Sequence, residues 1–224
     1  MIYLIFVIVY CVLNLPYQIK NHMTKVFIIN GGQEFGHSGG KFNDTVAAET
    51  FAFFTQQKDF EVKITNISSG YDAAEEVRNY VWADVIIYHT PIWWFQLPHD
   101  FKKYIDVVFT KGHAKGIYNS DGRSRSNPAI NYGKGGTMHG RKYMVNTSWN
   151  APKEAFTLPG EFFNERSVDD GPLFGFHRMN AFTGMEPLEG MHFHDIEKNA
   201  NVPRDLKLYR EHLAATFLKS EVTV

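Results

Sequence analysis

Residues 25–45 read KVFIINGGQEFGHSGGKFNDT and contain three kinds of segment in succession. The run from Val26 to Ile29 is apolar and mostly β-branched, which is typical of a buried strand. A polar, glycine-rich loop follows, and Val46, Phe51 and Phe54 then recur at the spacing of a helix. This part of the chain therefore predicts a strand, a loop and a helix.

The loop between this strand and this helix is a candidate site for an anion. The first N–H groups of a helix have no intrahelical partner, and the positive end of the helix dipole lies beside them. Both effects stabilise a phosphate group there. Gly36, Gly39 and Gly40 lack Cβ atoms, so the backbone can close around phosphate oxygens. Candidate side-chain donors are His37, Ser38, Lys41 and Thr45.

Two known phosphate loops are excluded. The dinucleotide fingerprint G-x-G-x-x-G is absent. The nucleoside-triphosphate loop G-x-x-x-x-G-K-[ST] also fails, because Phe42 follows Gly40-Lys41 and Phe35 stands at the place of the first glycine. What remains is a phosphate-binding turn of another type, or an ordinary flexible connection between a strand and a helix.

The composition is that of a soluble globular chain with one substantial core. The chain has 224 residues, of which 44% are hydrophobic and 21% charged. Its formal net charge of −1 argues against nucleic acid as the main partner, because a surface that follows phosphates needs a basic excess. The single cysteine, Cys11, excludes an internal disulfide and a cysteine-rich metal site, and it favours a cytoplasmic location.

The first 22 residues differ from the rest. Residues 1–15, MIYLIFVIVYCVLNL, are almost wholly apolar, yet they fall short of the roughly 20 residues that cross a bilayer. A basic n-region and an A-x-A cleavage site are missing, so a secretory signal fits poorly. We expect residues 1–22 to be an extension upstream of a true start at Met23, without stable membrane insertion, and residues 23–224 to form one domain. A membrane anchor is the competing interpretation.

Strand and helix patterns alternate along the remaining chain. Further strands are expected at residues 60–67, 84–89, 143–147 and 191–196, and helices at 72–82, 99–110 and 203–219. Residues 111–140 are expected to form a long polar loop, and residues 159–188 to be irregular because they contain several glycines and prolines. Strict alternation predicts an α/β fold, a five-stranded parallel sheet with helices on both faces.

In a parallel sheet of this kind, ligands bind beyond the C-terminal ends of the strands. The loops after the first, third and fourth predicted strands carry HSGGKFNDT (37–45), PIWWF (91–95) and SWNA (148–151). The sequence therefore predicts that these three loops converge. Backbone N–H groups of PIWWF can donate to the polar edge of a planar ring, and the indoles of Trp93 and Trp94 can cover its face; core packing is the alternative for both indoles.

Several motifs together carry a resemblance to a known family. They are NGG…FGHSGGKFNDT, WADVIIYHTPIWW, KKYIDVVFTKGH, SDGRSR, YGKGG and TSWNAPKEAF, in that order. With them, residues 23–224 resemble the flavin-dependent NAD(P)H–quinone oxidoreductases of the flavodoxin-like fold, and within that group the modulator of drug activity B subfamily. The resemblance implies bound FAD rather than FMN, a homodimer, and two-electron reduction of quinones by NADPH or NADH.

The same resemblance implies which residues hold the cofactor. The first flavin loop of the family falls on residues 38–45 with His37 beside it, the second on 92–95, and the third on 148–151, and one tyrosine is added. The residues are His37, Ser38, Gly39, Gly40, Lys41, Phe42, Asn43, Asp44, Thr45, Ile92, Trp93, Trp94, Phe95, Tyr132, Ser148, Trp149, Asn150 and Ala151. Ile92 departs from the glycine that relatives close to the type sequence of the subfamily carry.

The implied chemistry is hydride transfer through a flavin in a ping-pong cycle, in which the protein supplies orientation rather than a nucleophile. No catalytic acid and no metal ligand is predicted. Two alternatives remain: a reductase of azo or nitro compounds with the same site, and a flavodoxin-like electron carrier. Carriers usually have strongly acidic docking surfaces, which a net charge of −1 disfavours.

Two further motifs have plain interpretations. Alternation places His192 and His194 on one face of a strand, but without more ligands at chelating spacing a packed or solvated pair is favoured over a metal site. Arg123 and Arg125 can attract a cofactor phosphate or simply keep a loop soluble, so they do not decide between NADPH and NADH.

Overall fold

The structure is a computed structural model that describes residues 23–36 and 38–218. The predictions for residues 1–22 and for His37 lie outside these residues. Within the described ranges, every helix is too short or too polar to cross a membrane.

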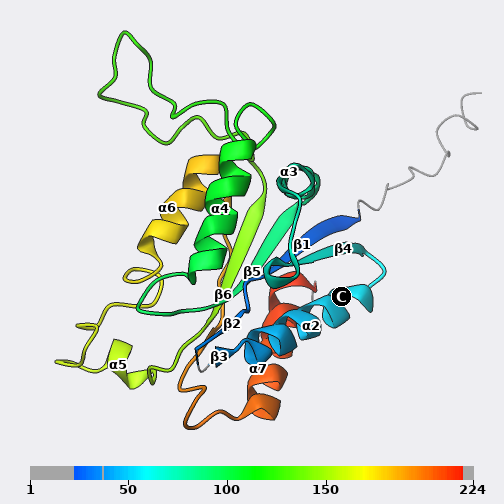
Figure 1. Cartoon of the computed structure of the whole chain (residues 1–224), viewed down its shortest axis with the longest axis vertical. Coiled ribbons are helices and arrows are strands. Elements are labelled where there is room, and N and C mark those ends of the chain that lie inside the picture. Colours follow the sequence, from blue (N-terminus) through cyan, green and yellow to red (C-terminus); the bar gives the residue numbers. More distant parts are fainter. Residues whose placement is uncertain (1–22, 37, 219–224) are drawn as a thin grey trace, which may run out of the picture.

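A parallel sheet runs through the centre of the molecule (Figure 1). Its strands are β1 (Thr24–Asn30), β4 (Phe60–Asn66), β5 (Val85–Pro91), β6 (Lys142–Ser148), β7 (Glu186–Pro187) and β8 (His192–Phe193). The order is β4-β1-β5-β6-β7, and β8 also pairs with β6. The chain thus leaves β1 first toward one side and then toward the other, so the point where strand order reverses lies between β1 and β5.

The two central strands explain why apolar runs dominated the sequence pattern. Every residue of β5 is buried, and so are the last five residues of β1. Strands of a parallel sheet that is covered on both faces cannot alternate between core and solvent, and they therefore read as continuous apolar runs. The edge strand β4 is only partly buried, which agrees with its mixed composition.

Helices cover both faces of the sheet (Figure 1). They are α2 (Lys41–Thr55), α3 (Ala73–Trp82), α4 (His99–Lys111), α5 (Glu154–Thr157), α6 (Phe174–Thr183) and α7 (Val202–Phe217). The hydrophobic cluster on one face joins side chains of α3, α4 and α6 to the sheet, and the cluster on the other face does so with α2 and α7. The predicted α/β architecture with two helical layers is confirmed.

Side-chain caps mark two of the helix starts. The carboxylate of Asp72 accepts from Glu75 N at 2.8 Å at the start of α3. Asn201 accepts from Arg204 N at 3.2 Å at the start of α7, where Pro203 lies in the first turn. Both helices lie within two residues of where the sequence predicted them.

The expectation that residues 159–188 are irregular is wrong for α6 and for β7. The helix is short, its two ends are marked by Gly171, Pro172 and Gly184, and its stabilisation comes from the tertiary contacts of Phe176 and Asn180. Asn180 Oδ1 accepts from the buried Tyr88 hydroxyl at 3.0 Å, and the Phe176 ring lies 4.9 Å from the Tyr88 ring. Packing therefore supplies what local propensity lacks.

The fifth strand is also different from its prediction. Instead of one strand at residues 191–196, two short pieces pair with opposite ends of β6. Lys142 pairs with Glu186 and Thr147 pairs with His192. Residues 186–193, the edge segment, therefore contain one residue more than β6 over the same span. The extra residue makes a bulge, and Gly190 lies in it beside Val145.

Residues 112–141 form the long loop that the sequence predicted, without helix or strand. Helix α4 starts beyond the C-terminal end of β5 and runs back along the sheet, so this loop lies at the N-terminal ends of the strands. Figure 1 shows the loop and the α5 region at opposite ends of the molecule.

Candidate functional site

The first predicted loop closes as a small hairpin that leads into α2. Two-residue strands, β2 (Glu34–Phe35) and β3 (Ser38–Gly39), pair antiparallel, and Gly40 then starts the helix with φ of 68°. No side chain among the described residues caps the first turn of α2. A Cβ on Gly40 would lie 3.1 Å from the backbone of Gln33 and would be strained at this positive φ, so glycine is favoured here.

Not every side chain of the first loop is available to a ligand. The hydroxyl of Thr45 donates to Lys41 O at 2.8 Å, and Asp44 accepts from Asn30 Nδ2 at 2.6 Å. Lys41 is exposed and partly balances the acidic Asp44 in the same helical turn. Backbone N–H groups, the Ser38 hydroxyl and Lys41 are therefore the donors that this turn offers to an anion.

The second loop contains a strained tight turn. Trp94 and Phe95 have φ of 48° and 65°, and Trp93 and Gln96 exchange two backbone hydrogen bonds of 3.0 Å. A two-residue hairpin of this form normally uses Gly or Asn at both centres. Two aromatic residues in left-handed conformation are rare, and such outliers collect at ligand sites.

The aromatic side chains of this turn face solvent rather than the core. Trp94 is 91% exposed and Phe95 45% exposed, while Trp93 stacks on the exposed ring of Phe35 at 5.2 Å. Core packing is therefore wrong for Trp94, whereas Trp93 is half-buried. Trp94 and Phe95 form an apolar ledge beside the C-terminal end of β5.

The third loop follows β6, and its first residue joins all three segments. Ser148 Oγ accepts from the buried Asn43 side chain of the first loop at 3.0 Å. The carbonyl of Ser148 accepts from Ile92 N of the second loop, also at 3.0 Å. The predicted convergence of the three loops is thus present, and Ser148 is its junction.

The remaining predicted residues divide into two groups. Trp149 is buried, and its indole packs against the Phe156 ring at 5.0 Å, whereas Asn150 is exposed. Tyr132 lies elsewhere: it is 71% exposed, its ring contacts Phe182 at the far end of α6, and it belongs to the loop at the opposite end of the sheet. Within one chain, the structure does not bring Tyr132 to the other predicted residues.

An aromatic group that the sequence analysis missed links the second and third loops. Phe162, 68% exposed, stacks on Phe95 at 5.2 Å, and Phe163 stacks on Phe156 at 3.9 Å with an angle of 6° between the rings. The doublet Phe162-Phe163 in a segment rich in glycine and charge was the available signal. Its rings extend the apolar ledge of Trp94 and Phe95.

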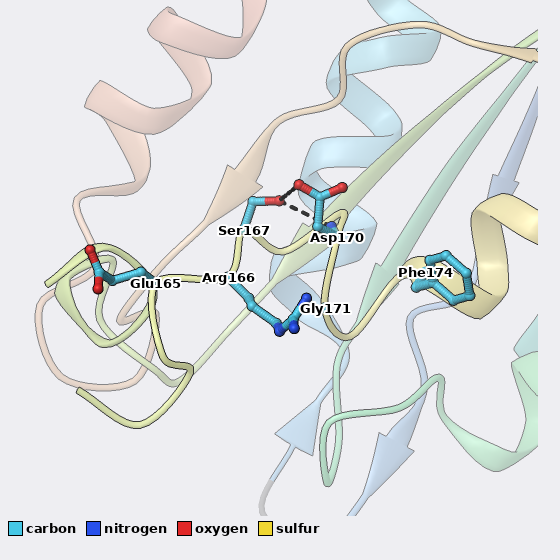
Figure 2. A pocket seen from close by; sticks show the side chains of 6 residues that line it. All are labelled: Glu165, Arg166, Ser167, Asp170, Gly171 and Phe174. Carbon is cyan, nitrogen blue, oxygen red and sulfur yellow. Dashed lines mark hydrogen bonds between the residues drawn. The ribbon is translucent and has the colours of Figure 1, made fainter. Parts of the chain in front are cut away.

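Two hollows lie next to this ledge. One, of about 660 Å³, is lined by Gln96 and Leu97, by α4 and by residues 171–176. The other, of about 770 Å³, is open and is lined by residues 165–174; Figure 2 shows Arg166 pointing into it and Ser167 hydrogen-bonded to Asp170. Neither is lined by a residue of the first or third loop.

The two histidines of the HFHD motif already have partners. His192 bonds to Thr147 and Asp169, and His194 Nδ1 lies 3.3 Å from Ala151 O. Within the described chain, no group of three or more His, Cys, Asp or Glu side chains is arranged for a metal ion.

His89, on β5, hydrogen-bonds to the two segments that flank the first loop. Its carbonyl accepts from Gly31 N at 2.7 Å, and its Nε2 lies 2.9 Å from Thr50 Oγ1. Thr50 donates its own proton to Val46 O, so the hydroxyl accepts from His89, and His89 carries its proton on Nε2. Complete burial lowers the pKa of His89 to about 3.

We expect His89 to make the fold sensitive to acid. The unfolded chain binds a proton at this residue below about pH 6.5, whereas the folded chain keeps it neutral, so stability falls as the pH drops from 6.5 toward 3. Between pH 7 and pH 5 this residue alone costs about 2 kcal/mol. Urea unfolding of the wild type and of His89→Gln at both pH values measures the difference. Equal slopes with pH in the two proteins would contradict this role.

Comparison with known proteins agrees with the geometry. Residues 24–217 match the family described as Flavodoxin-like fold. The NADPH:quinone oxidoreductase MdaB of Haemophilus influenzae is 40% identical over 192 residues, which cover 86% of this chain and 98% of that protein. A protein from P. pentosaceus titled NADPH-quinone reductase has a similar structure, with a TM-score of 0.60, 15% identity, and coverage of 88% of this chain and all of the other.

A third neighbour contains a cofactor in its crystal structure. General stress protein 14 of Treponema denticola, in complex with FMN, has a TM-score of 0.58 and 21% identity, and the match covers 86% of this chain and 99% of that chain. At sequence identities this low, the structural similarity shows only that the fold is shared. The family match and the MdaB relative cover the same domain, and this chain therefore belongs to the flavodoxin-like family, in the group that includes MdaB.

Proposed function

We propose that this chain is an NAD(P)H:quinone oxidoreductase that binds a flavin at the edge formed by its first, second and third loops. One observation carries the proposal: three loops far apart in sequence meet at Ser148, at the C-terminal ends of β1, β5 and β6. The 40% identity with an NADPH:quinone oxidoreductase over nearly its whole length supports the same conclusion.

The residues present fit a flavin. The uncapped first turn of α2 and the glycine turn before it suit the phosphate tail. The apolar ledge of Trp94, Phe95 and Phe162 suits a planar ring, and the backbone near Ile92 and Ser148 lies beside it. A bound flavin would accept a hydride from NADPH or NADH and pass two electrons to the quinone. The chain itself would hold the tail, orient the ring and keep one face open to the two substrates in turn.

The cofactor proposed here is FAD, on the resemblance of the loops, although FMN would meet the first loop with the same phosphate. Heating the purified holoprotein and separating the released flavin by chromatography distinguishes the two. Purified, folded protein that is colourless and takes up neither flavin would overturn the proposed function. With flavin bound, NADPH or NADH oxidation with menadione as acceptor should give parallel lines in a double-reciprocal plot, the pattern of a ping-pong cycle.

We also propose that the active form is a homodimer in the cytoplasm and that Tyr132 acts in the site of the partner. The motif around Tyr132 belongs to the implied cofactor set, yet this residue lies at the end of the sheet opposite to Ser148 in its own chain. In a dimer with a twofold axis, the Tyr132 end of each chain would meet the Ser148 end of the other chain, which gives two equivalent sites. The exposed rings of Trp94, Phe162 and Tyr132 would then be covered.

Mixing two defective variants tests this arrangement. We expect Tyr132→Ala and Gly40→Val to lose most activity on their own, because each removes one half of every site. After unfolding and refolding together, half of the dimers contain one chain of each kind, and each of these has one intact site, so about one quarter of wild-type activity should return. No recovery, with dimers of both kinds present by size-exclusion chromatography, would mean that Tyr132 serves its own chain.

A further inference from the structure

Asp169 accepts hydrogen bonds from histidines on two different elements. His177 Nε2, on α6, lies 2.9 Å from Asp169 Oδ1, and His192 Nε2, on β8, lies 3.4 Å from both carboxylate oxygens. These donors hold the pKa of the Asp169 carboxyl well below its usual range. The group is therefore an ionised carboxylate, which only accepts hydrogen bonds.

The second nitrogen of each imidazole is also engaged. His177 Nδ1 lies 2.6 Å from the Tyr143 hydroxyl, and His192 Nδ1 lies 2.7 Å from Thr147 Oγ1. The Thr147 hydroxyl in turn lies 2.7 Å from the indole Nε1 of Trp149. Two arms thus extend from the carboxylate, one to each end of β6.

The direction of every bond in the His192 arm follows from the donors. The ionised Asp169 only accepts, so His192 Nε2 carries a proton, and Nδ1 of the neutral ring then accepts from Thr147 Oγ1. An indole N–H can only donate, so Thr147 Oγ1 in turn accepts from Trp149. In the other arm, the Tyr143 hydroxyl donates to His177 Nδ1 and His177 Nε2 donates to Asp169. One carboxylate therefore determines the tautomer of both histidines.

The His192 arm ends at the third loop. Thr147 and Trp149 flank Ser148, where the three loops meet, and all three residues are buried. The backbone adds further support from the same edge segment, since Thr147 N donates to Met191 O and Trp149 N donates to Phe193 O. These two backbone hydrogen bonds come from the edge segment itself. The side-chain bonds through His192 depend in addition on Asp169, which lies outside that segment.

We propose that Asp169 is a positioning residue for the third loop: by fixing the tautomer of His192 it orients Thr147 and Trp149, and so sets residues 148–151 for the cofactor. This role rests on the proposed flavin site and adds to it a residue that touches neither cofactor nor substrate. The surface segment 164–173 thereby becomes part of the support of the site.

Asp169→Asn disrupts the His192 arm while leaving the size of the side chain at residue 169 nearly unchanged. The amide oxygen can accept from one histidine, but the amide N–H₂ then faces the N–H of the other. If His192 moves its proton to Nδ1, Thr147 Oγ1 receives two donors and its own proton loses its acceptor. The strain therefore reaches the buried indole of Trp149, even though the substitution is made at the surface.

The adjacent Asp170 provides a matched control. Its carboxylate accepts from Ser167 Oγ at 2.9 Å and its N–H donates to the same hydroxyl at 3.0 Å (Figure 2). Asp170→Asn makes the same change of charge one residue away, and no hydrogen bond joins Asp170 to His177 or His192 in the described chain.

The test measures the third loop directly, with and without flavin. Protein labelled with ¹⁵N in tryptophan and histidine reports hydrogen exchange at the Trp149 indole, assigned with Trp149→Phe, and the tautomer of His192, recorded at about pH 8, where free imidazole is neutral. We expect Asp169→Asn to speed Trp149 exchange and to weaken flavin binding, each by about tenfold, the effect of losing one hydrogen bond to a charged group. Asp170→Asn should match the wild type, and Asp169→Glu should restore part of the protection.

The outcomes separate this role from the proposed function. If the wild type binds no flavin, the proposed function fails and the positioning role fails with it, whatever the exchange rates show. If the wild type binds flavin but Asp169→Asn keeps its Trp149 exchange and its His192 tautomer, the hydrogen-bond chain does not control the loop. Faster exchange with unchanged flavin affinity would also overturn the role, because Asp169 would then stabilise the edge of the sheet without affecting the site.

Discussion

Replacing Gly190 by alanine is expected to lower the free energy of unfolding by about 3 kcal/mol. A Cβ at this position would lie 2.0 Å from the carbonyl oxygen of Val145, closer than two non-bonded atoms can approach. Neither partner can move freely, because Val145 is in the buried strand β6 and Gly190 is in the bulge between β7 and β8. The edge segment must therefore shift away from the sheet.

Urea unfolding monitored by circular dichroism measures this loss, and Gly175→Ala is its control. Gly175 lies in the first turn of α6 and does not have a positive φ, and a Cβ added to it would meet no atom within 4 Å. Alanine there should leave stability unchanged or raise it by about 0.5–1 kcal/mol, because alanine favours the helix. Equal stability of Gly190→Ala and wild type would mean that the edge segment is looser than its bulged pairing suggests.

The second large effect is expected on flavin binding. Gly40→Val should weaken it by about a hundredfold, because a β-branched residue at φ of 68° costs about 2–3 kcal/mol and its Cβ meets the Gln33 backbone at 3.1 Å. The chain can relieve this strain only by moving the turn that precedes α2. The donors of the first helical turn would then no longer be aligned for the phosphate tail.

Flavin affinity is measured by quenching of flavin fluorescence during titration of apoprotein. Gly39→Val is the matched control, since Gly39 does not have a positive φ and a Cβ there meets only the flexible side chain of Lys41 at 3.7 Å or more. It should bind flavin nearly as the wild type does. If Gly40→Val fails to fold, Gly40→Ala keeps the comparison with a smaller strain. Wild-type affinity in Gly40→Val would place the phosphate tail away from this turn.

Local patterns in the sequence were sufficient for most of the fold. The apolar runs of β1 and β5, the glycine turn before α2 and the helical spacing of apolar residues in α7 each express short-range chemistry, so strand, helix and loop could be predicted from neighbouring residues. Because the carboxyl ends of parallel strands share one edge, the convergence of the three loops followed from the order of elements. The resemblance of the motifs added the prediction of which residues hold the cofactor.

Contacts between distant residues decided the remainder. Helix α6 escaped prediction because packing on Tyr88 stabilises it rather than its own propensity, and the bulge at Gly190 follows from how the edge segment meets β6.

The sequence by itself determined the alternation of elements and the three loops, because both arise from residues close together in the chain. Only the tertiary structure determined that Ser148 joins the loops and that Asp169, His177 and His192 form one hydrogen-bonded group. The physical reason is that a hydrogen bond depends on distance and direction in space, and the residues on either side of Asp169 in sequence contain no record of which histidines the fold will bring to it.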